Sequence, residues 1–347
     1  MRLVAPRVPD DVQPGRRPTF SVLVAVHNGA AVVGDALASA LAQTVRPLEV
    51  IVCDDGSTDE LAAALEPFAN EIVVLRQPRG GEGAAKNTAA RAASGDFVAI
   101  LDADDVYLPR RIEALGELAS QRPDLDILTT DAYLEAGGRV VRRCYDQTWQ
   151  FDVVDQRRAI LDRNFIFGLA AVRRTRLLGA GGFDELLRWA TDWDCWLRLI
   201  LDGAQAGLVD EPLARYRLST TSLTAQRTQL YLGRVAVLEK ASRSPQLTSG
   251  ERTAVATSLR RERGHAAASA AVDALRTRAP GARRLALEAA RSPHQRLARR
   301  IRFLAAAAAP KTAGRRLDHA APTGAAGVAM PGDEAANAPT PAGEAPR

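Results

Sequence analysis

The sequence has few of the residues from which covalent cross-links and zinc sites are built. Its 347 residues include three cysteines, Cys53, Cys144 and Cys195, with no paired spacing among them. An odd number of widely separated cysteines argues against a disulfide framework and against a zinc knuckle. We therefore expect three free thiols and a protein that works in the reducing cytoplasm.

Long apolar runs are also missing. The stretch before Phe20 carries prolines and charges where a signal peptide needs an apolar core of about 7 to 15 residues. The longest candidate elsewhere, FLAAAAAP from Phe303 to Pro310, is far shorter than the roughly 18 apolar residues of a membrane span. The sequence predicts neither a signal peptide nor a transmembrane helix.

Lysine is scarce, since Lys86, Lys240 and Lys311 are the only three, and arginine carries most of the positive charge. The net charge is +5, but much of the basic excess lies beyond residue 250. Because this charge is not spread over the chain, we do not expect nucleic acid as a partner.

What the sequence does contain is a regular alternation of short apolar runs with Ala- and Leu-rich segments, within a hydrophobic content of 46%. Such alternation predicts right-handed β-α-β crossovers. The expected strands are Phe20–Val26, Leu48–Cys53, Ile72–Leu75 and Phe97–Leu101, and the expected helices are Ala31–Gln43, Glu60–Phe68, Ala84–Ala93 and Pro109–Ser120. The predicted fold is α/β, Rossmann-like, with a mostly parallel central sheet flanked by helices.

Beyond residue 125 the pattern is less regular. We expect a strand at Asp126–Thr130, a hairpin at Glu135–Val141, and a helix at Thr191–Asp202 with Trp193 and Trp196 on one apolar face. The remaining expectations are a helix at about Val153–Asp162, a strand at Gly168–Arg173 and short extended segments in Leu208–Tyr216.

The composition divides the chain into four predicted parts. Residues 1–18 read as a disordered leader, and residues 19–227 as the α/β domain. Residues 228–310 are Ala- and Arg-rich and predict an additional α-helical C-terminal region of two or three helices, while residues 311–347 read as a disordered tail.

The stretch GDFVAILDADD, residues 95–105, is a buried strand that ends in three carboxylates. Asp102, Asp104 and Asp105 therefore lie at the carboxyl end of a strand, where open α/β sheets bind ligands. Carboxylates this close repel one another, and a hard cation such as Mg²⁺ or Mn²⁺ relieves that repulsion. The alternative is an acidic turn in which Asp104 or Asp105 caps the next helix.

A second acidic cluster, DDGSTD, follows the second strand. Asp54 and Asp55 lie there at the strand end, where a carboxylate is placed to accept hydrogen bonds from a nucleobase or ribose. The alternative is a turn in which Ser57 or Asp59 caps the following helix.

Two further motifs carry polar residues into the same region. In GGEGAAKN, glycines let the backbone approach a ligand, and Lys86 stands in the first turn of a helix, where it suits a phosphate or a base. In RWATDWDCW, Asp192 stands at the start of a helix beside two tryptophans, which suits a general base of raised pKa and aromatic contacts with a sugar. The alternative is that Asp192 only complements the helix dipole while Asp194 and Arg198 form a surface pair.

Five blocks, in order and at the right spacing, resemble the family 2 glycosyltransferases with the GT-A fold. The blocks are FSVLVAVHNGA, VIVCDDGSTDE, GEGAAKNTAARAASGDFVAILDADD, GGFDELLRWATDWDCWLRL and EPLARYRLSTTSLT, and together they cover about residues 19–226.

The resemblance implies an inverting, metal-dependent transfer of a sugar from a nucleotide donor of UDP or dTDP type to a hydroxyl acceptor. Four positions would line the nucleotide site: Ala25, His27, Asp55 and Lys86. Asp102 and Asp104 would be the DxD pair at the ribose and the metal-bridged diphosphate, and Asp192 would be the base. Arg217 falls in the block that closes over the donor in relatives, and Asp105 would only support the turn.

The partners implied are a glycan or lipid-linked acceptor, as in the synthesis of cell-surface polysaccharide or glycolipid, and a peripheral contact with the inner face of the membrane through the basic C-terminal region. Two other functions stay open at this point. One is a sugar-nucleotide-binding module without catalysis. The other is a haloacid-dehalogenase-type phosphatase, because DADDV also fits the strand-ending motif of that class.

Overall fold

The computed structural model describes residues 16–218, 223–291 and 297–308. Residues 1–15 of the predicted leader, and the whole predicted tail from residue 311 onward, lie outside the described part of the chain.

The first hundred residues build the predicted β-α units in the predicted order. Parallel pairing joins β1 to β2 and β4, and β2 to β3. The elements are β1 (Phe20–Val26), α1 (Val33–Leu41), β2 (Glu49–Asp55), α2 (Leu61–Leu65), the 3-10 turn η1 (Glu66–Phe68), β3 (Val73–Gln77), α3 (Glu82–Ala92) and β4 (Phe97–Ile100). Unlike the prediction, β2 continues through Asp54 and Asp55, so both carboxylates belong to the strand.

The next hundred residues complete the sheet with mixed pairing. Their elements are β5 (Val106–Tyr107), α4 (Arg111–Gln121), β6 (Ile127–Ala136), β7 (Arg139–Arg143), α5 (Gln156–Asp162), β8 (Ala171–Arg173), α6 (Arg174–Gly179), α7 (Thr191–Leu201) and β9 (Ala206–Leu218). The strand order is β3-β2-β1-β4-β8-β6-β9-β5, with β7 paired to β6. β8 runs antiparallel to both β4 and β6, and β5 runs antiparallel to β9, whereas β6 and β9 run parallel, so the second half of the sheet is mixed.

One expectation for this half was wrong. The predicted short segments at Leu208–Tyr216 form a single strand, β9, that pairs with β6 along its length. Register shifts at Asp131 absorb the irregularity that Pro212 introduces, since proline cannot donate to a ladder.

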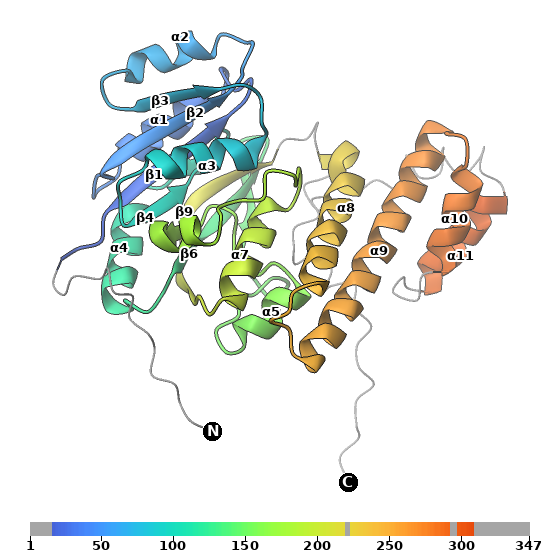
Figure 1. Ribbon diagram of the computed structural model, residues 1–347. Helices are drawn as coiled ribbons and strands as arrows, with labels where there is room; N and C mark the ends of the chain where they lie inside the picture. The colour runs from blue at the N-terminus through green and yellow to red at the C-terminus, as the bar shows by residue number, and fades with distance from the viewer. Residues whose placement is uncertain (1–15, 219–222, 292–296, 309–347) are drawn as a thin grey trace.

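Both faces of the sheet are covered. Alternate residues of β1 point to opposite sides: Val22 and Val24 pack in the layer of α1 and α4, whereas Leu23 packs in the layer of α3, α5 and α7. This two-sided burial is why the strands read as unbroken apolar runs. Figure 1 shows α3 against the N-terminal strands and α7 between the sheet and α8.

The C-terminal region contains four described helices where two or three were expected: α8 (Leu223–Ser242), α9 (Ser249–Thr277), α10 (Ala282–Arg291) and α11 (Leu297–Ala308). A capping box between Thr248 and Glu251 starts α9. The Ala-rich composition allows α9, α10 and α11 to pack closely around a small core of their own, visible at the right of Figure 1.

The domain boundary predicted at residue 227 falls within α8. Val237, Leu238 and Ala241 of α8 belong to the same buried cluster as α7, so the core of the α/β domain continues past that residue. Whether residues 19–227 fold without α8 stays a prediction.

The three cysteines are free, as expected, and all three are buried. Within the described ranges, no helix is long and apolar enough to cross a bilayer.

Candidate active site

The polar loops predicted to converge do so around the carboxyl ends of β1, β2 and β4. His27 follows β1, Asp54 and Asp55 end β2, and Asp102 and Asp104 follow β4. Because β1 pairs in parallel with both β2 and β4, these strand ends lie at one edge of the sheet.

The Asp55 carboxylate is hydrogen-bonded to other residues of the protein. It accepts hydrogen bonds from Gln77 Nε2 at 2.8 Å and from the backbone N–H groups of Gly80 and Gly81 at 2.7 and 2.8 Å. Burial opposes its ionisation, but these three donors outweigh burial and lower the pKa of Asp55. Asp55 thus shapes the loop before α3.

The Asp54 carboxylate also contacts residues of the protein itself. Its carboxylate accepts from the N–H of Ser57 at 2.8 Å and pairs with Arg76 at 3.3 Å. The alternative in which Ser57 or Asp59 caps the helix is wrong, because α2 has no side-chain cap. Instead, Ser57 Oγ accepts from the N–H of Asn28, and Asp59 accepts from the N–H of Ala30, both at 2.9 Å.

The end of β1 is tied to this turn. His27 Nδ1 lies 3.0 Å from the carbonyl oxygen of Asp55, and Arg79 donates to His27 Nε2. Ala25 stands two residues earlier on β1, in register with Cys53 of β2. Ala25, His27 and Asp55 therefore share the corner between β1 and β2.

Lys86 is buried and held between two carboxylates. Its ammonium lies 3.0 Å from Asp102 Oδ1 and pairs with Glu82 one helical turn earlier. Burial disfavours the charge, but Asp102 and Glu82 outweigh burial and raise the pKa of Lys86 above its usual value. Lys86 stays positive and fixes the position of Asp102.

Asp104 differs from Asp102 and Asp105 because its side chain has neither an ion pair nor a hydrogen bond with any other residue that the structure describes. Enclosure within the site and the charge of Asp102 raise its pKa, although its side chain keeps solvent-exposed surface. A negative group left in this state next to Asp102 is suited to a cation from outside the protein.

Asp105 is fully buried. Its Oδ1 accepts from the backbone N–H of Arg217 at 2.8 Å, while its Oδ2 has no hydrogen-bond partner. Burial and the charges of Asp102 and Asp104 raise its pKa well above the usual value. The alternative in which this turn caps the next helix is wrong, because α4 begins without a side-chain cap; Asp105 instead fastens the end of β9 to the DADD turn.

The guanidinium of Arg217 donates to Asp35 Oδ2 of α1 at 2.8 Å. Its charge acts on Asp104 and Asp105. The structure therefore brings Arg217 to the DADD turn, where its backbone N–H donates to Asp105.

Asp192 lies in the first turn of α7, after Ala190, which adopts a left-handed backbone with φ 57°. Its Oδ2 accepts from Asn164 Nδ2 at 3.0 Å. Burial raises the pKa of Asp192, while Trp193 N–H and Lys86 act in the opposite direction. The charges of Lys86, Glu82 and Asp102 act on Asp192, so this carboxylate lies within electrostatic range of the DADD turn.

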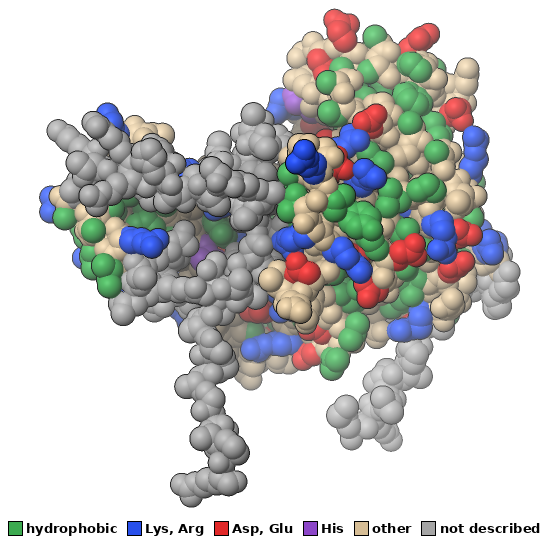
Figure 2. Space-filling model, turned by 180° about the vertical axis from the view of Figure 1, so that it is seen from behind, with side chains coloured by type: hydrophobic (Ala, Val, Ile, Leu, Met, Phe, Trp, Pro, Cys, Tyr) green, Lys and Arg blue, Asp and Glu red, His purple; other side chains and the backbone are tan. Residues whose placement is uncertain are grey.

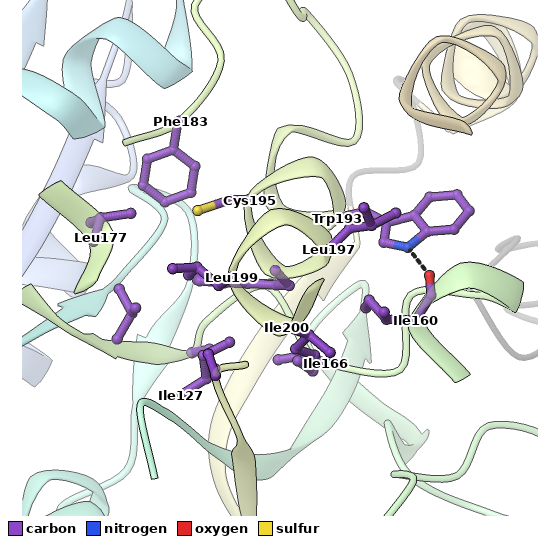
Figure 3. Close-up of a cluster of buried hydrophobic side chains, with 14 of the residues drawn as sticks. Ile127, Ile160, Ile166, Leu177, Phe183, Trp193, Cys195, Leu197, Leu199 and Ile200 are labelled. Carbon is purple, nitrogen blue, oxygen red and sulfur yellow. Dashed lines mark hydrogen bonds between the residues drawn. The ribbon is translucent and has the colours of Figure 1, made fainter. Parts of the chain in front are cut away.

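The two tryptophans of α7 do not face a sugar site, which corrects that expectation. Trp193 and Trp196 are 2% and 0% exposed, and Trp193 Nε1 donates to the carbonyl oxygen of Ile160 at 2.8 Å. Figure 3 shows α7 surrounded by apolar side chains from several elements. The sequence predicted one apolar face for this helix and a second face exposed to solvent. In the structure α8 covers that second face, so α7 is buried almost all round.

Asp194 is also buried, so its pair with Arg198 at 2.8 Å is not the surface pair that was expected. It therefore contributes to the attachment of α7 rather than to a solvated face.

The donor set fits a divalent cation shared with a ligand. Among the residues that the structure describes, no three His, Cys, Asp or Glu side chains are grouped to hold a metal by themselves. Mg²⁺, however, commonly takes one or two carboxylates and completes its coordination with waters and substrate phosphates. Asp102 and the unpaired Asp104 supply such a set.

Sequence reasoning missed two contributors to this site. Asn164 holds Asp192, and Glu82 holds Lys86. The i,i+4 spacing of Glu82 and Lys86 was a usable signal. Asn164 lies in an irregular segment 28 residues before its partner, and nothing local marks it.

Residues 21–177 match the family model described as Glycosyl transferase family 2. An uncharacterised glycosyltransferase of Rickettsia prowazekii is 30% identical over 186 residues, covering 52% of this chain and 58% of that protein. The chondroitin synthase of Escherichia coli is 31% identical over 190 residues, covering 53% of this chain and 27% of that protein. The chain thus spans less than two thirds of the length of these relatives.

Solved structures of low sequence identity share the fold. TarS of S. aureus, residues 1–349 in complex with UDP-GlcNAc, has a TM-score of 0.57 at 17% identity and covers 87% of this chain and 92% of its own. A mannosyltransferase of Pyrobaculum calidifontis in complex with GDP-Man and Mn²⁺ has a TM-score of 0.58 at 22% identity, with 90% and 83% covered. Residues 21–177 thus form a glycosyltransferase family 2 domain, and the architecture is that of the GT-A fold.

Proposed function

We propose that this protein transfers a sugar from a nucleoside-diphosphate donor to a hydroxyl acceptor, with inversion at the anomeric carbon. The family match supports a glycosyl transfer. The neighbouring structures were solved with UDP-GlcNAc or with GDP-Man, which supports a nucleotide sugar of either base as the donor here. The donor types expected from the sequence, UDP or dTDP, are therefore widened to include GDP.

In this proposal the donor lies across the carboxyl ends of β1, β2 and β4. Ala25 and His27 line the base and ribose, together with the loop that Asp54 and Asp55 hold. Asp102 and Asp104 would hold Mg²⁺ or Mn²⁺, and Lys86 keeps Asp102 in place. A divalent ion bound there would neutralise the negative charge that develops on the diphosphate leaving group.

Asp192 acts as the general base. It takes the proton of the acceptor hydroxyl as the oxygen attacks the anomeric carbon from the face opposite the departing diphosphate. Its raised pKa brings its proton affinity closer to that of a useful base at neutral pH. Asn164 fixes the carboxylate, since its amide donates to one oxygen and leaves the other for the hydroxyl.

The observation that carries the proposal is that Lys86, which pairs with Asp102 at 3.0 Å, also acts electrostatically on Asp192, so that three separate elements contribute charges to one region. The test is transfer by purified Asp192→Asn and Asp104→Ala, with donor binding measured in parallel by titration calorimetry. We expect Asp192→Asn to bind the donor but not to transfer, and Asp104→Ala to lose both metal-supported binding and transfer. Unimpaired transfer by both variants would refute the assignment.

The two other functions fare differently. The phosphatase alternative is contradicted, because the chain matches glycosyltransferase family 2 and has the GT-A fold. If the protein were a binding module without catalysis, the unaltered protein would bind the donor but transfer no sugar. The same transfer assay therefore tests this alternative, and transfer by the unaltered protein would refute it.

We also propose a peripheral contact between the C-terminal helices and an anionic membrane, which would bring the site near a lipid-linked acceptor. On α11, Ile301 and Leu304 are 56% and 51% exposed beside the exposed Arg302. Figure 2 shows basic and apolar side chains together on this part of the surface. Such a mixture suits a helix resting on anionic headgroups.

Co-sedimentation of the full chain with anionic and with neutral vesicles tests this contact. We expect pelleting with anionic vesicles that weakens as salt rises, and less pelleting for a variant that carries Ile301→Ser and Leu304→Ser. No pelleting at low salt would refute the proposal.

A further inference from the structure

Helix α8 follows the predicted catalytic unit in the sequence, yet its Lys240 reaches back into that unit. The ammonium lies 2.6 Å from Asp184 Oδ2 and 2.8 Å from Asp194 Oδ1. Asp184 belongs to the loop of residues 180–190 between α6 and α7, which we call the α6–α7 loop. Asp194 belongs to the first turn of α7, two residues after Asp192.

A second contact lies two turns earlier on α8. Gly233 packs so closely on Trp189 that a Cβ at this position would lie 2.5 Å from Trp189 Cβ and 2.9 Å from its carbonyl oxygen. A larger residue would push Trp189 away. Trp189 immediately precedes Ala190, the left-handed residue that starts α7, so α8 contacts both ends of the segment leading to Asp192.

On its other side the α6–α7 loop is attached to α3. Asn87 donates from Nδ2 to the carbonyl oxygen of Phe183 and to Glu185 Oε1, each at 2.9 Å, and its Oδ1 accepts from the N–H of Phe183 at 2.7 Å. Lys86 directly precedes Asn87, and its ammonium lies 5.9 Å from the centre of the Phe183 ring. The loop therefore spans the distance from α8 to the donor site.

An open cavity of about 350 Å³ is bordered by residues of the loop together with Arg198 and Lys240, and its lining includes neither Asp192 nor the DADD carboxylates. Arg198 donates to the carbonyl oxygens of Ala180 and Gly182 at 2.7 and 2.6 Å, which holds the start of the loop. Farther along the loop, Asp184 pairs with Lys240 and Trp189 packs against Gly233.

We propose that α8 is a positioning element of the active site: Lys240 and Gly233 hold the α6–α7 loop and the first turn of α7 so that Asp192 faces the acceptor. The inference rests on the proposed function, because it assigns these residues a part in the transfer reaction. Lys240 does not touch the reacting atoms and acts only through Asp184 and Asp194.

The expected effect is on turnover rather than on donor binding. Asp102 and Asp104 lie on the loop after β4, and no contact of Lys240 or Gly233 reaches them. Replacing Lys240 leaves Asp194 with Arg198 alone and leaves Asp184 without its cation. Displacement of a catalytic group by about 1 Å costs as much as 100-fold in rate, so we expect kcat of Lys240→Met to fall roughly 10- to 100-fold.

The experiment compares the full-length protein with Lys240→Met, Lys240→Arg, Gly233→Leu and Arg263→Met. Arginine can still bridge the two aspartates and should restore most of the activity. Arg263 forms an equivalent ion pair, 2.7 Å from Glu239, between α9 and α8, but touches neither the loop nor α7. Its removal controls for the loss of one ion pair on the same helix.

The readouts are kcat, the donor Kd and hydrogen–deuterium exchange over residues 180–194. We expect Lys240→Met and Gly233→Leu to lower kcat, leave the donor Kd within about twofold and speed exchange in this segment, whereas Arg263→Met and Lys240→Arg resemble the unaltered protein. Exchange and kcat unchanged in Lys240→Met would overturn the inference. If the unaltered protein transfers no sugar, the proposed function fails, and the exchange comparison alone decides the inference.

Discussion

Two acidic clusters flank β1, one at the end of β2, Asp54–Asp59, and one after β4, Asp102–Asp105, and the fold treats them in opposite ways. In the first, Asp54, Asp55 and Asp59 each accept hydrogen bonds from backbone N–H groups. In the second, Asp104 has no ion pair with any described residue and Asp105 Oδ2 has no hydrogen-bond partner.

The difference teaches what distinguishes a structural carboxylate from one that awaits a ligand. Backbone donors neutralise the first turn, and the pKa of Asp55 falls. The second turn keeps its mutual repulsion, and the pKa of Asp104 rises. Both strand ends are rich in aspartate, so composition does not separate them; the number of donors within reach does.

The largest expected effect comes from Asp104→Ala. Transfer should fall on the order of 10³-fold, because the charge that stabilises the leaving diphosphate is lost. The unfolding free energy of the metal-free protein should stay the same or rise, since Asp102 loses a repelling neighbour. Initial rates with Mn²⁺ and urea denaturation without metal measure the two quantities. A clear loss of stability would mean that both turns are structural.

The reverse is expected of Asp55→Ala. Removing the acceptor of three hydrogen bonds should lower the unfolding free energy by about 2 kcal/mol, because donors held by a charged group lose their partner. Glu60→Ala is the matched control, as Glu60 is an exposed carboxylate of the same turn. Urea denaturation gives the difference. Stability equal to that of the control would remove the contrast between the turns.

Asp192 is intermediate between the two acidic clusters, because its carboxylate accepts a hydrogen bond from one neutral side chain, Asn164. Asn164→Ala should lower kcat about tenfold and move the acid limb of the pH–rate profile upward, because the ionised carboxylate loses a hydrogen bond that favours it. A merely structural role of Asn164 would lower the rate without moving the limb. The kcat/KM profile from pH 4 to pH 8 distinguishes the two.

The smallest effect is on the pH dependence of stability. The folded-state pKa of Asp55 is lowered. Asp55 therefore contributes to the unfolding free energy above its unfolded-state pKa near 4, and this contribution is lost as pH falls through the folded-state pKa. For Asp104 the folded-state pKa is raised, so the favourable contribution is present below about pH 4 and is lost as pH rises through the folded value.

Melting temperatures of the metal-free protein from pH 3 to pH 7 should therefore change in opposite ways. Asp55→Asn should flatten the loss of stability on the acid side, and Asp104→Asn should flatten the loss above about pH 4. Glu60→Gln controls for removing one exposed carboxylate. Parallel pH profiles for the two aspartate variants would show that the turns do not differ electrostatically.

The first half of the fold could be predicted closely because its signals are local. β1 has the predicted bounds, and each predicted strand and helix up to residue 101 is present. Apolar runs, glycines and strand-ending aspartates report the chain's own periodicity. The second half resisted prediction because β8 and β9 insert between or beside strands distant in sequence, and the pairing partner decides whether a segment becomes a strand.

The sequence by itself determined the β-α order, the acidic strand ends and the candidate residues Lys86, Asp102, Asp104 and Asp192. Only the tertiary structure decided which aspartates the protein itself satisfies and which it leaves for a ligand. Asp105 meets Arg217 at a separation of 112 residues, and Lys240 meets Asp184 at a separation of 56. Neither separation leaves a trace in local periodicity, since hydrogen bonds and ion pairs depend on distance in space rather than along the chain.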